Sequence, residues 1–230
     1  MKILEGVLCS ISNNQIADTL QRLGSTFVEG GIHPRFGTRN FTAPLAGGQY
    51  IEVVLPLDHP ATGATPWGKD VSQKAQEGGG WGTWVFSTED ISPIETKFGR
   101  DAVDSHRTRP NGTDLKCKQI GAKEITDSRE LPFFIQWLTS DHLSQDRTVV
   151  SKIGKIVIAD KNPLAESWFK SETFGALAEV TIDWVDPSTN NGDDGIVSVH
   201  LSTPNNSGVL DYYLKSSAHG WCIPCATHKP

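Results

Sequence analysis

An internal repeat limits the possible folds of this chain more than any other feature. Residues 5–24 and 81–99 each begin near a glycine with a strand-like run, continue through polar residues into a short amphipathic pattern, and end at a glycine. An apolar strand follows each copy after a turn-rich segment, at 49–55 in the first and at 132–138 in the second. The pattern predicts two copies of one unit that contains a strand, a helix and further strands.

The residues at the ends of the two predicted helices favour helix starts and stops at these places. In the first copy Ser12 and Asn13 can accept hydrogen bonds from the free amides of a helix start, and Gly24 suits the left-handed residue after a helix end. In the second copy Pro93 suits a first helical turn and Gly99 suits the residue after the last.

A weaker third copy begins at 154–175 with another strand, cap and helix pattern. Two alternating strands follow at 177–186 and 195–203, and the polar, glycine-containing segment 190–195 between them predicts a hairpin loop. The segment 58–80, between the first two copies, is rich in proline and glycine. Its composition predicts a loop-like stretch that is either a mobile connector or a lid.

Glu52 is a charged residue inside the apolar strand of the first copy. Because an unpaired carboxylate is costly to remove from water, this side chain needs a partner, a shifted pKa or a hydrated cavity. When the two copies are aligned, Glu52 corresponds to Gln136, and strand alternation places Tyr50 on the face of Glu52. We predict that all three line one cavity between the copies, with Glu52 as the catalytic base and Tyr50 and Gln136 as ligand-binding residues.

A purely structural role for Glu52 is the alternative. Its carboxylate would then make a buried hydrogen bond, or an ion pair with Arg35, Arg39 or Arg107, and would only tie strands together.

Four further residues are candidate ligand contacts. His33 and Arg35 belong to a proline-containing loop that could overhang the cavity and bind an anionic group, although loop histidines are more often simply exposed. His106 has a similar status in the second copy. Trp84 either walls the cavity or packs in the core.

Composition excludes several classes of protein. The net charge of −6 and the scattered lysines and arginines argue against binding to duplex nucleic acid. The one basic stretch, 106–119, could attract a small anion or form a solvated hairpin. No apolar run reaches the roughly 18 residues of a membrane span, and Glu5 interrupts any signal peptide. Only four cysteines are present, too few for a disulfide framework, so we expect a cytoplasmic protein.

The C-terminal tail carries a separate motif. Cys222 and Cys225 are flanked by His219 and His228, a set of side chains that zinc prefers. A zinc site, a disulfide across the pair and a flexible or surface-packed tail are all compatible with this spacing.

The repeat resembles a known superfamily, the vicinal oxygen chelate proteins, and in particular their glyoxalase-like-domain members. The resemblance rests on four segments, in this order and spacing: 31–54, 81–91, 109–117 and 131–137. It implies an α+β fold of tandem βαβββ modules that form a cleft, with a third partial module at the C-terminal end. The implied divisions are paired modules in 1–145 (1–57 and 81–140, with the linker 58–80), a third partial module in 146–218 and a tail in 219–230.

The resemblance also implies metal ligands on the first and last strand of each module. On this sequence the four places fall at Gly6, Glu52, Gly82 and Gln136. Glycine offers no ligand atom, and a carboxylate plus an amide make a poor divalent site. A divalent metal is thus possible through Glu52 and Gln136, and Glu5 or a flanking residue could fill one place only if the register is shifted by one, which turns its side chain to the opposite face. No cofactor is predicted.

The implied function is that of a cytoplasmic glyoxalase-like protein that binds a small organic ligand, anionic or carbonyl-bearing, in the module cleft. As an enzyme it would be an isomerase or lyase with Glu52 as general base. The alternative is a non-catalytic protein that binds or sequesters a small molecule after loss of the metal site. The sequence leaves open catalysis, the ligand, and whether the chain is a monomer or a homodimer.

Overall fold

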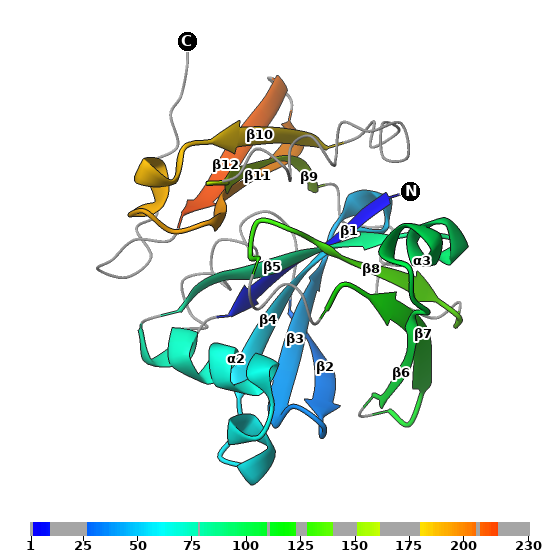
Figure 1. Cartoon of the computed structure of the whole chain (residues 1–230). Coiled ribbons are helices and arrows are strands. Elements are labelled where there is room, and N and C mark those ends of the chain that lie inside the picture. Colours follow the sequence, from blue (N-terminus) through cyan, green and yellow to red (C-terminus); the bar gives the residue numbers. More distant parts are fainter. Residues whose placement is uncertain are drawn as a thin grey trace.

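The computed structural model describes residues 2–9, 27–77, 79–109, 111–122, 128–139, 151–161, 180–205 and 208–215, with the backbone alone at 2–9 and from 202 onward. These residues form two sheets, a larger one of eight strands and a smaller one of four (Figure 1). Within this part of the chain, no helix combines the length and the apolar character needed to cross a membrane.

The larger sheet contains two modules with the same strand order. Its strands are β1 (Lys2–Cys9), β2 (Val28–His33), β3 (Thr38–Pro44), β4 (Tyr50–Pro56), β5 (Gly80–Ser87), β6 (Val103–Thr108), β7 (Asp114–Ile120) and β8 (Phe133–Trp137). They lie in the order β2-β3-β4-β1-β5-β8-β7-β6. The first strand of each module pairs in parallel with its last, β1 with β4 and β5 with β8, and β1 and β5 join the modules antiparallel to each other. The predicted tandem modules are therefore confirmed.

Helix α3 (Ser92–Phe98) occupies the predicted place in the second module. Pro93 lies in its first turn, the Asp90 carboxylate accepts a hydrogen bond from the Ser92 backbone N–H, and Gly99 ends the helix at φ 64°. Only glycine adopts that left-handed conformation without strain. The corresponding helix of the first copy, with Ser12, Asn13 and Gly24, lies outside the described residues.

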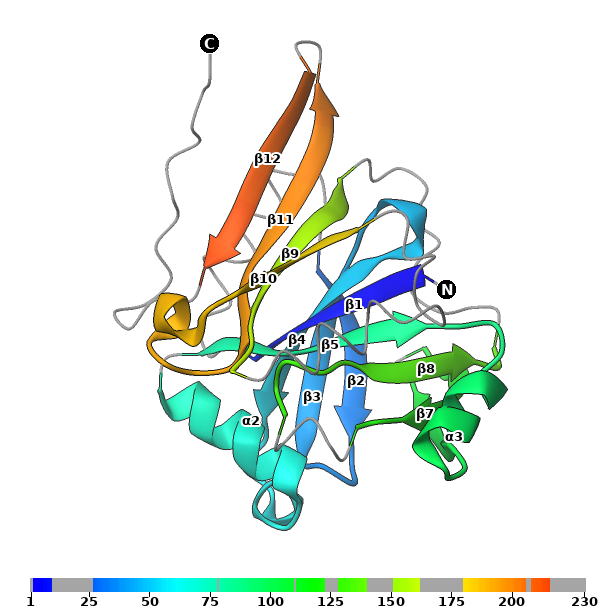
Figure 2. The ribbon, with the colours of Figure 1, turned by 45° about the horizontal axis from the view of Figure 1, so that its top comes forward.

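The third copy forms the smaller sheet, which packs against one face of the larger one (Figures 1 and 2). Its strands are β9 (Lys152–Ala159), β10 (Thr181–Val185), β11 (Gly195–Asn205) and β12 (Gly208–Lys215), in the order β10-β9-β11-β12. The prediction of a hairpin between β10 and β11 is wrong, because both strands pair with opposite edges of β9. This arrangement places the apolar β9 between β10 and β11. The segment that connects β10 to β11 passes β9 and forms a 3-10 turn, η4 (Pro187–Asn190).

The main hydrophobic core lies between the two sheets. Alternate residues of β4, β5 and β8 face the smaller sheet and meet the isoleucines of β9 there. The fully buried members include Ile51, Trp84, Phe86, Phe134, Ile153, Ile156, Ile158, Val199 and Leu201. One face of the larger sheet is thereby covered, and the opposite face is left for a site.

Gln49 fastens the smaller sheet to the larger one just after the 3-10 turn η1 (Ala46–Gly48). Its side-chain oxygen accepts a hydrogen bond from Ile153 N at 2.7 Å, and its side-chain nitrogen donates to Ile153 O at 3.4 Å. Ala46 N donates to Ser151 O at 2.7 Å nearby. These buried polar contacts fix the point at which β9 begins.

The segment between the modules contains a helix, so its prediction as a loop-like connector or lid is wrong over α2 (Pro66–Gln76). The side chain of Thr65 accepts a hydrogen bond from Gly68 N and caps the helix, and Val71 is fully buried against the sheet. Gly68 passes so close to the preceding turn η2 (Pro60–Gly63) that a Cβ atom would lie 2.5 Å from Thr62 O. The glycine that suggested a loop is needed for this close approach.

Candidate functional site

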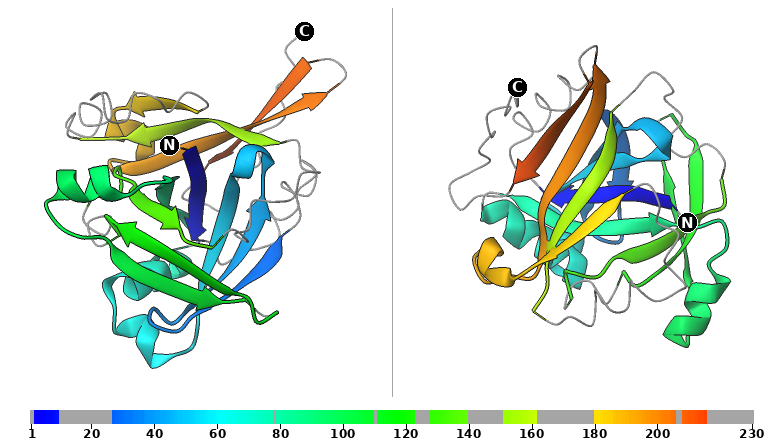
Figure 3. Two further views of the ribbon diagram at one scale, coloured as in Figure 1. Left: turned by 90° about the vertical axis from the view of Figure 1, so that its right-hand side faces the viewer. Right: turned by 90° about the horizontal axis from the view of Figure 1, so that it is seen from above.

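A cavity of about 460 Å³ lies on the face of the larger sheet that the smaller sheet leaves uncovered. The sheet curls until its two edge strands, β2 and β6, approach each other, as the left view of Figure 3 shows. At the closest point a Cβ atom on Gly31 would lie 3.1 Å from Thr108 O. The cavity is therefore lined by residues of both modules and of helix α2.

Glu52 lies on this cavity in the middle of β4 and is only 8% exposed. The side-chain amide of Asn40, on the neighbouring strand β3, donates a hydrogen bond to Glu52 Oε1. Asn40 is fully buried, and it fits because Gly30 has no side chain, since a Cβ atom there would overlap the amide. Glu52 thus has both a hydrogen-bond partner and an opening to a cavity. The predicted cavity position and the alternative of a structural hydrogen bond are therefore both found in the structure.

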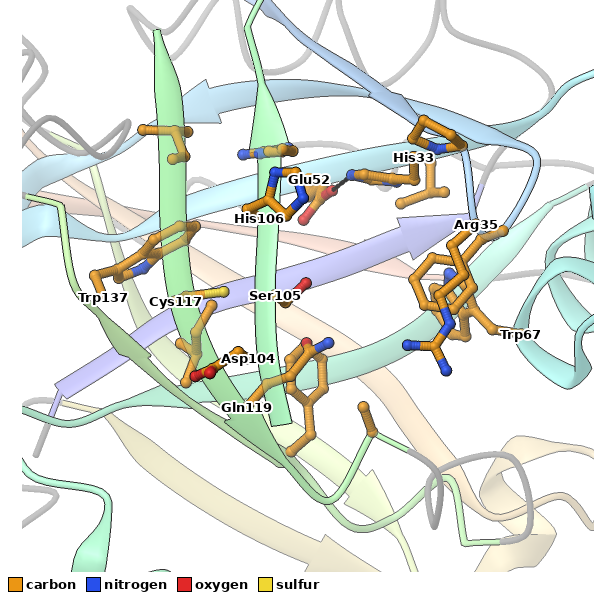
Figure 4. A pocket seen from close by; sticks show the side chains of 18 of the residues that line it. His33, Arg35, Glu52, Trp67, Asp104, Ser105, His106, Cys117, Gln119 and Trp137 are labelled. Atoms are coloured by element: carbon orange, nitrogen blue, oxygen red, sulfur yellow. Dashed lines mark ion pairs between the residues drawn. The ribbon is translucent and has the colours of Figure 1, made fainter. Parts of the chain in front are cut away.

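His33 is the nearest titratable neighbour of Glu52. Its Nε2 lies 4.0 Å from Glu52 Oε1, and its Nδ1 lies 3.1 Å from Thr38 Oγ1 (Figure 4). Burial lowers the pKa of His33, the Glu52 carboxylate opposes this shift, and the Arg107 guanidinium adds to it. We therefore treat the imidazole as neutral near pH 7, able to donate or accept a hydrogen bond at the nitrogen that faces the cavity.

Aromatic side chains form much of the remaining wall. Trp67 of helix α2 lies across the cavity from Trp137 of β8 (Figure 4). Tyr50 and Phe133 add further aromatic surface, and Tyr50 is only 1% exposed. An apolar lining with few polar groups is typical of sites for small organic molecules.

Two predicted polar contacts lie at the rim. Arg35 is exposed, and its guanidinium carbon lies 5.7 Å from the centre of the Phe36 ring. The His106 side chain is 73% exposed, and its Nδ1 lies 3.4 Å from Asp114 Oδ1. The structure thus brings Glu52, Tyr50, His33, Arg35 and His106 to one cavity, as the sequence predicts, and it separates Gln136 and Trp84 from them.

The prediction that Gln136 shares a cavity with Glu52 is wrong. Tyr50 on β4 pairs with Glu5 on β1, Glu5 pairs with Val85 on β5, and Val85 pairs with Phe133 on β8. These four residues therefore form one row across the sheet. Residues in one row share a face, so the cavity side of β8 carries Phe133, Ile135 and Trp137 and leaves Gln136 on the other side.

Gln136 instead holds the start of helix α3. Its side-chain nitrogen donates to Glu89 O at 2.7 Å, and its side-chain oxygen accepts from Ile91 N at 3.3 Å. A shift of one residue in the alignment of the two copies accounts for the wrong face.

Trp84 is also not a cavity residue. It is fully buried in the core between the sheets, with its ring centre 5.1 Å from that of Phe86 and 6.5 Å from that of Trp184. Its indole N–H donates to Glu130 O at 3.1 Å. The core position, which was one of the two predicted places, is the correct one.

Several cavity residues were not predicted. The loop prediction for 58–80 does not point to Trp67 as a cavity residue. Cys117 has no neighbouring motif in the sequence that would mark it as one. Asn40 could have been found, because Thr38, Asn40 and Thr42 form a period-two polar pattern beside an apolar strand. All three are fully buried.

The residues present do not fit the divalent metal site that the resemblance implies. Gly6 has no donor atom and pairs with Ile51 and Trp84, which face the core, so the expected position is shifted by one residue. In the row of Glu52, β1 and β5 carry Val7 and Thr83, and Gln136 lies on the other face. Glu52 and His33 are the two donors that remain close together, and no group of three histidine, cysteine or acidic side chains suited to a metal occurs among the described residues. The reaction proposed for this cavity therefore uses only side chains of this protein.

Acidification is expected to destabilise the protein through His33. Because its pKa is lower in the folded state, the unfolded chain binds this proton more readily. The contribution to stability is full above the ordinary histidine value of 6.5 and is lost as the pH falls below it. We expect the variant His33→Gln to show a smaller fall in Tm than the wild type between about pH 7.5 and pH 5.5. In His106→Gln, which removes an exposed side chain, the fall should match the wild type; equal falls in all three proteins would contradict the assignment.

Similar solved structures include a hypothetical protein, BH1468, from Bacillus halodurans C-125, with 10% identity over 62% of this chain and 97% of that one and a TM-score of 0.39. A methylmalonyl-CoA epimerase shows 12% identity over 60% of this chain and 94% of that one, also with a TM-score of 0.39. No curated protein matches the sequence. A family described as glyoxalase-like domain matches residues 7–174. The protein belongs to this glyoxalase-like domain family.

Proposed function

We propose that the protein is a cytoplasmic isomerase or lyase that binds a small carbonyl compound in this cavity and moves a proton with Glu52. One observation carries the proposal: a carboxylate that is only 8% exposed borders a cavity large enough for a metabolite. Buried carboxylates that border a cavity are standing candidates for proton transfer.

The proposed reaction begins at a C–H bond next to a carbonyl group. The Glu52 carboxylate takes the proton, and the electron pair of the C–H bond moves to the carbonyl oxygen as an enolate forms. Return of the proton to the opposite face of the same carbon, as the electron pair moves back from oxygen and re-forms the carbonyl, gives the inverted isomer. Departure of a leaving group with its electron pair from the next carbon, as the enolate re-forms the carbonyl and a C=C bond forms, gives a lyase product. Asn40 holds Glu52 Oε1 in place, and His33, as a neutral imidazole, is available to the ligand oxygen.

A non-catalytic binding protein is the second candidate. The observation that favours it is the row of Glu52 across β1 and β5, in which Val7 and Thr83 stand in place of a histidine or an acid. Such a protein would keep the aromatic lining, which selects the ligand, without turning it over.

Hydrogen exchange into solvent tests the two candidates directly. The protein is incubated in D₂O with a panel of 2-oxo and 2-hydroxy carbonyl compounds, and deuterium incorporation is followed by NMR while ligand binding is followed by the rise in Tm. Catalysed exchange for a compound that also raises Tm supports the enzyme. A rise in Tm without exchange for any compound would reject it in favour of the binding protein.

A further inference from the structure

Arg107 faces the cavity from the edge strand β6. It pairs with Leu115 on β7, a fully buried residue that lines the cavity, and paired residues share one face of a sheet. The residue before it, His106, pairs with the exposed Lys116 and lies at the rim, where its exposed side chain contacts Asp114. Alternation along β6 thus directs Arg107 inward.

Arg107 also lies near His33. The next residue, Thr108, meets Gly31 where β2 and β6 approach, and Gly31 precedes His33 by two positions. The charges of Arg107 and Glu52 both act on the His33 imidazole, the first lowering its pKa and the second raising it. Arg107, His33 and Glu52 all line the same cavity.

The guanidinium of Arg107 has no acidic partner among the described residues. Arg39 and Arg129 form ion pairs with Glu29 and Asp70. Arg107 is half-buried, and the structure records no ion pair between it and Asp104, the acid on its own strand. A partly desolvated guanidinium without a counter-charge is a ready site for an anion, and its fork of N–H donors matches a carboxylate.

We propose that Arg107 binds the carboxylate of the ligand and that the ligand class is the 2-oxo acids with an apolar side chain. The carboxylate pairs with Arg107, the adjacent carbonyl lies near His33, and the next carbon presents its C–H bond to Glu52. The apolar side chain then contacts Trp67, Phe133 and Trp137. This inference rests on the proposed function and names its substrate class.

Matched acids and esters test the inference. The probes are phenylpyruvate and 4-methyl-2-oxopentanoate, each compared with its methyl ester, and dissociation constants are measured by calorimetry at fixed ionic strength. We expect the wild type to bind each acid at least about tenfold more tightly than its ester, as for other charge-assisted hydrogen bonds. In Arg107→Met the preference should fall to within about twofold, and Arg107→Lys should restore part of it.

Arg39→Met is the matched control, because Arg39 is ion-paired with Glu29 and is not among the residues that line this cavity. Its acid preference should equal that of the wild type. The inference is overturned if Arg107→Met keeps the preference, if Arg39→Met alone loses it, or if the wild type binds neither acid at 10 mM. Exchange of a neutral carbonyl compound that depends on Glu52 would, in any of these cases, leave the proposed function standing.

Discussion

Replacing Glu52 with glutamine is expected to lower the rate of deuterium exchange by a factor of about 10² to 10⁴, the usual contribution of a general base. The amide removes the basic oxygen but keeps an oxygen that can accept the hydrogen bond from Asn40, so the fold should be retained. The dissociation constant of the bound compound should change by less than about fivefold, because a lost base affects the transition state rather than binding. Both quantities are measured with one exchanging compound by NMR and calorimetry.

Gln136→Leu provides the contrast. It breaks the hydrogen bonds to Glu89 O and Ile91 N, so we expect a loss of about 1–2 kcal/mol in the free energy of unfolding. Exchange and affinity should stay unchanged, because this side chain lies on the other face of β8. If Glu52→Gln exchanged at the wild-type rate, or if Gln136→Leu alone abolished exchange, the assignment of the base would be wrong.

The difference between these two residues shows what a repeat in a sequence can predict. Duplication specifies the order of strands, because each copy must bury its apolar strand against its own first strand, and β4 and β8 do so. The face of a residue depends on register, which changes with a shift of one position. The two copies reach their last strands through segments of different length, so alignment of Glu52 with Gln136 could not specify the register.

The cavity residues divide in the same way. Glu52, Tyr50 and His33 were predictable because strand alternation and the adjacent loop act over short distances in the sequence. Trp67 and Arg107 reach the cavity only because helix α2 packs on the sheet and because the sheet curls until β2 and β6 meet. Neither event has a local signal in the sequence. In α2 the close approach to Thr62 requires a glycine at position 68, and that glycine favoured the loop prediction.

Three strands of the smaller sheet, β9, β10 and β11, were predictable, whereas β12 and the pairing pattern were not. The two strands of the expected hairpin lie on either side of β9, and β9 in turn depends on contacts with residues about 100 positions earlier. Gln49 makes the most specific of these contacts. A polar residue before an apolar strand gave no indication of this role.

Replacing Gln49 with leucine is expected to cost about 3 kcal/mol in the free energy of unfolding. The side chain is only 5% exposed, and leucine would leave the N–H and C=O groups of Ile153 without their partner in the interior. Each buried polar group that loses its hydrogen bond costs about 1–3 kcal/mol. Urea unfolding followed by tryptophan fluorescence measures the change.

Gln73→Leu, on the exposed side of helix α2 where Gln73 bonds to Glu77, should change stability by less than about 0.5 kcal/mol. Equal stability of the two variants would show that Gln49 does not hold β9.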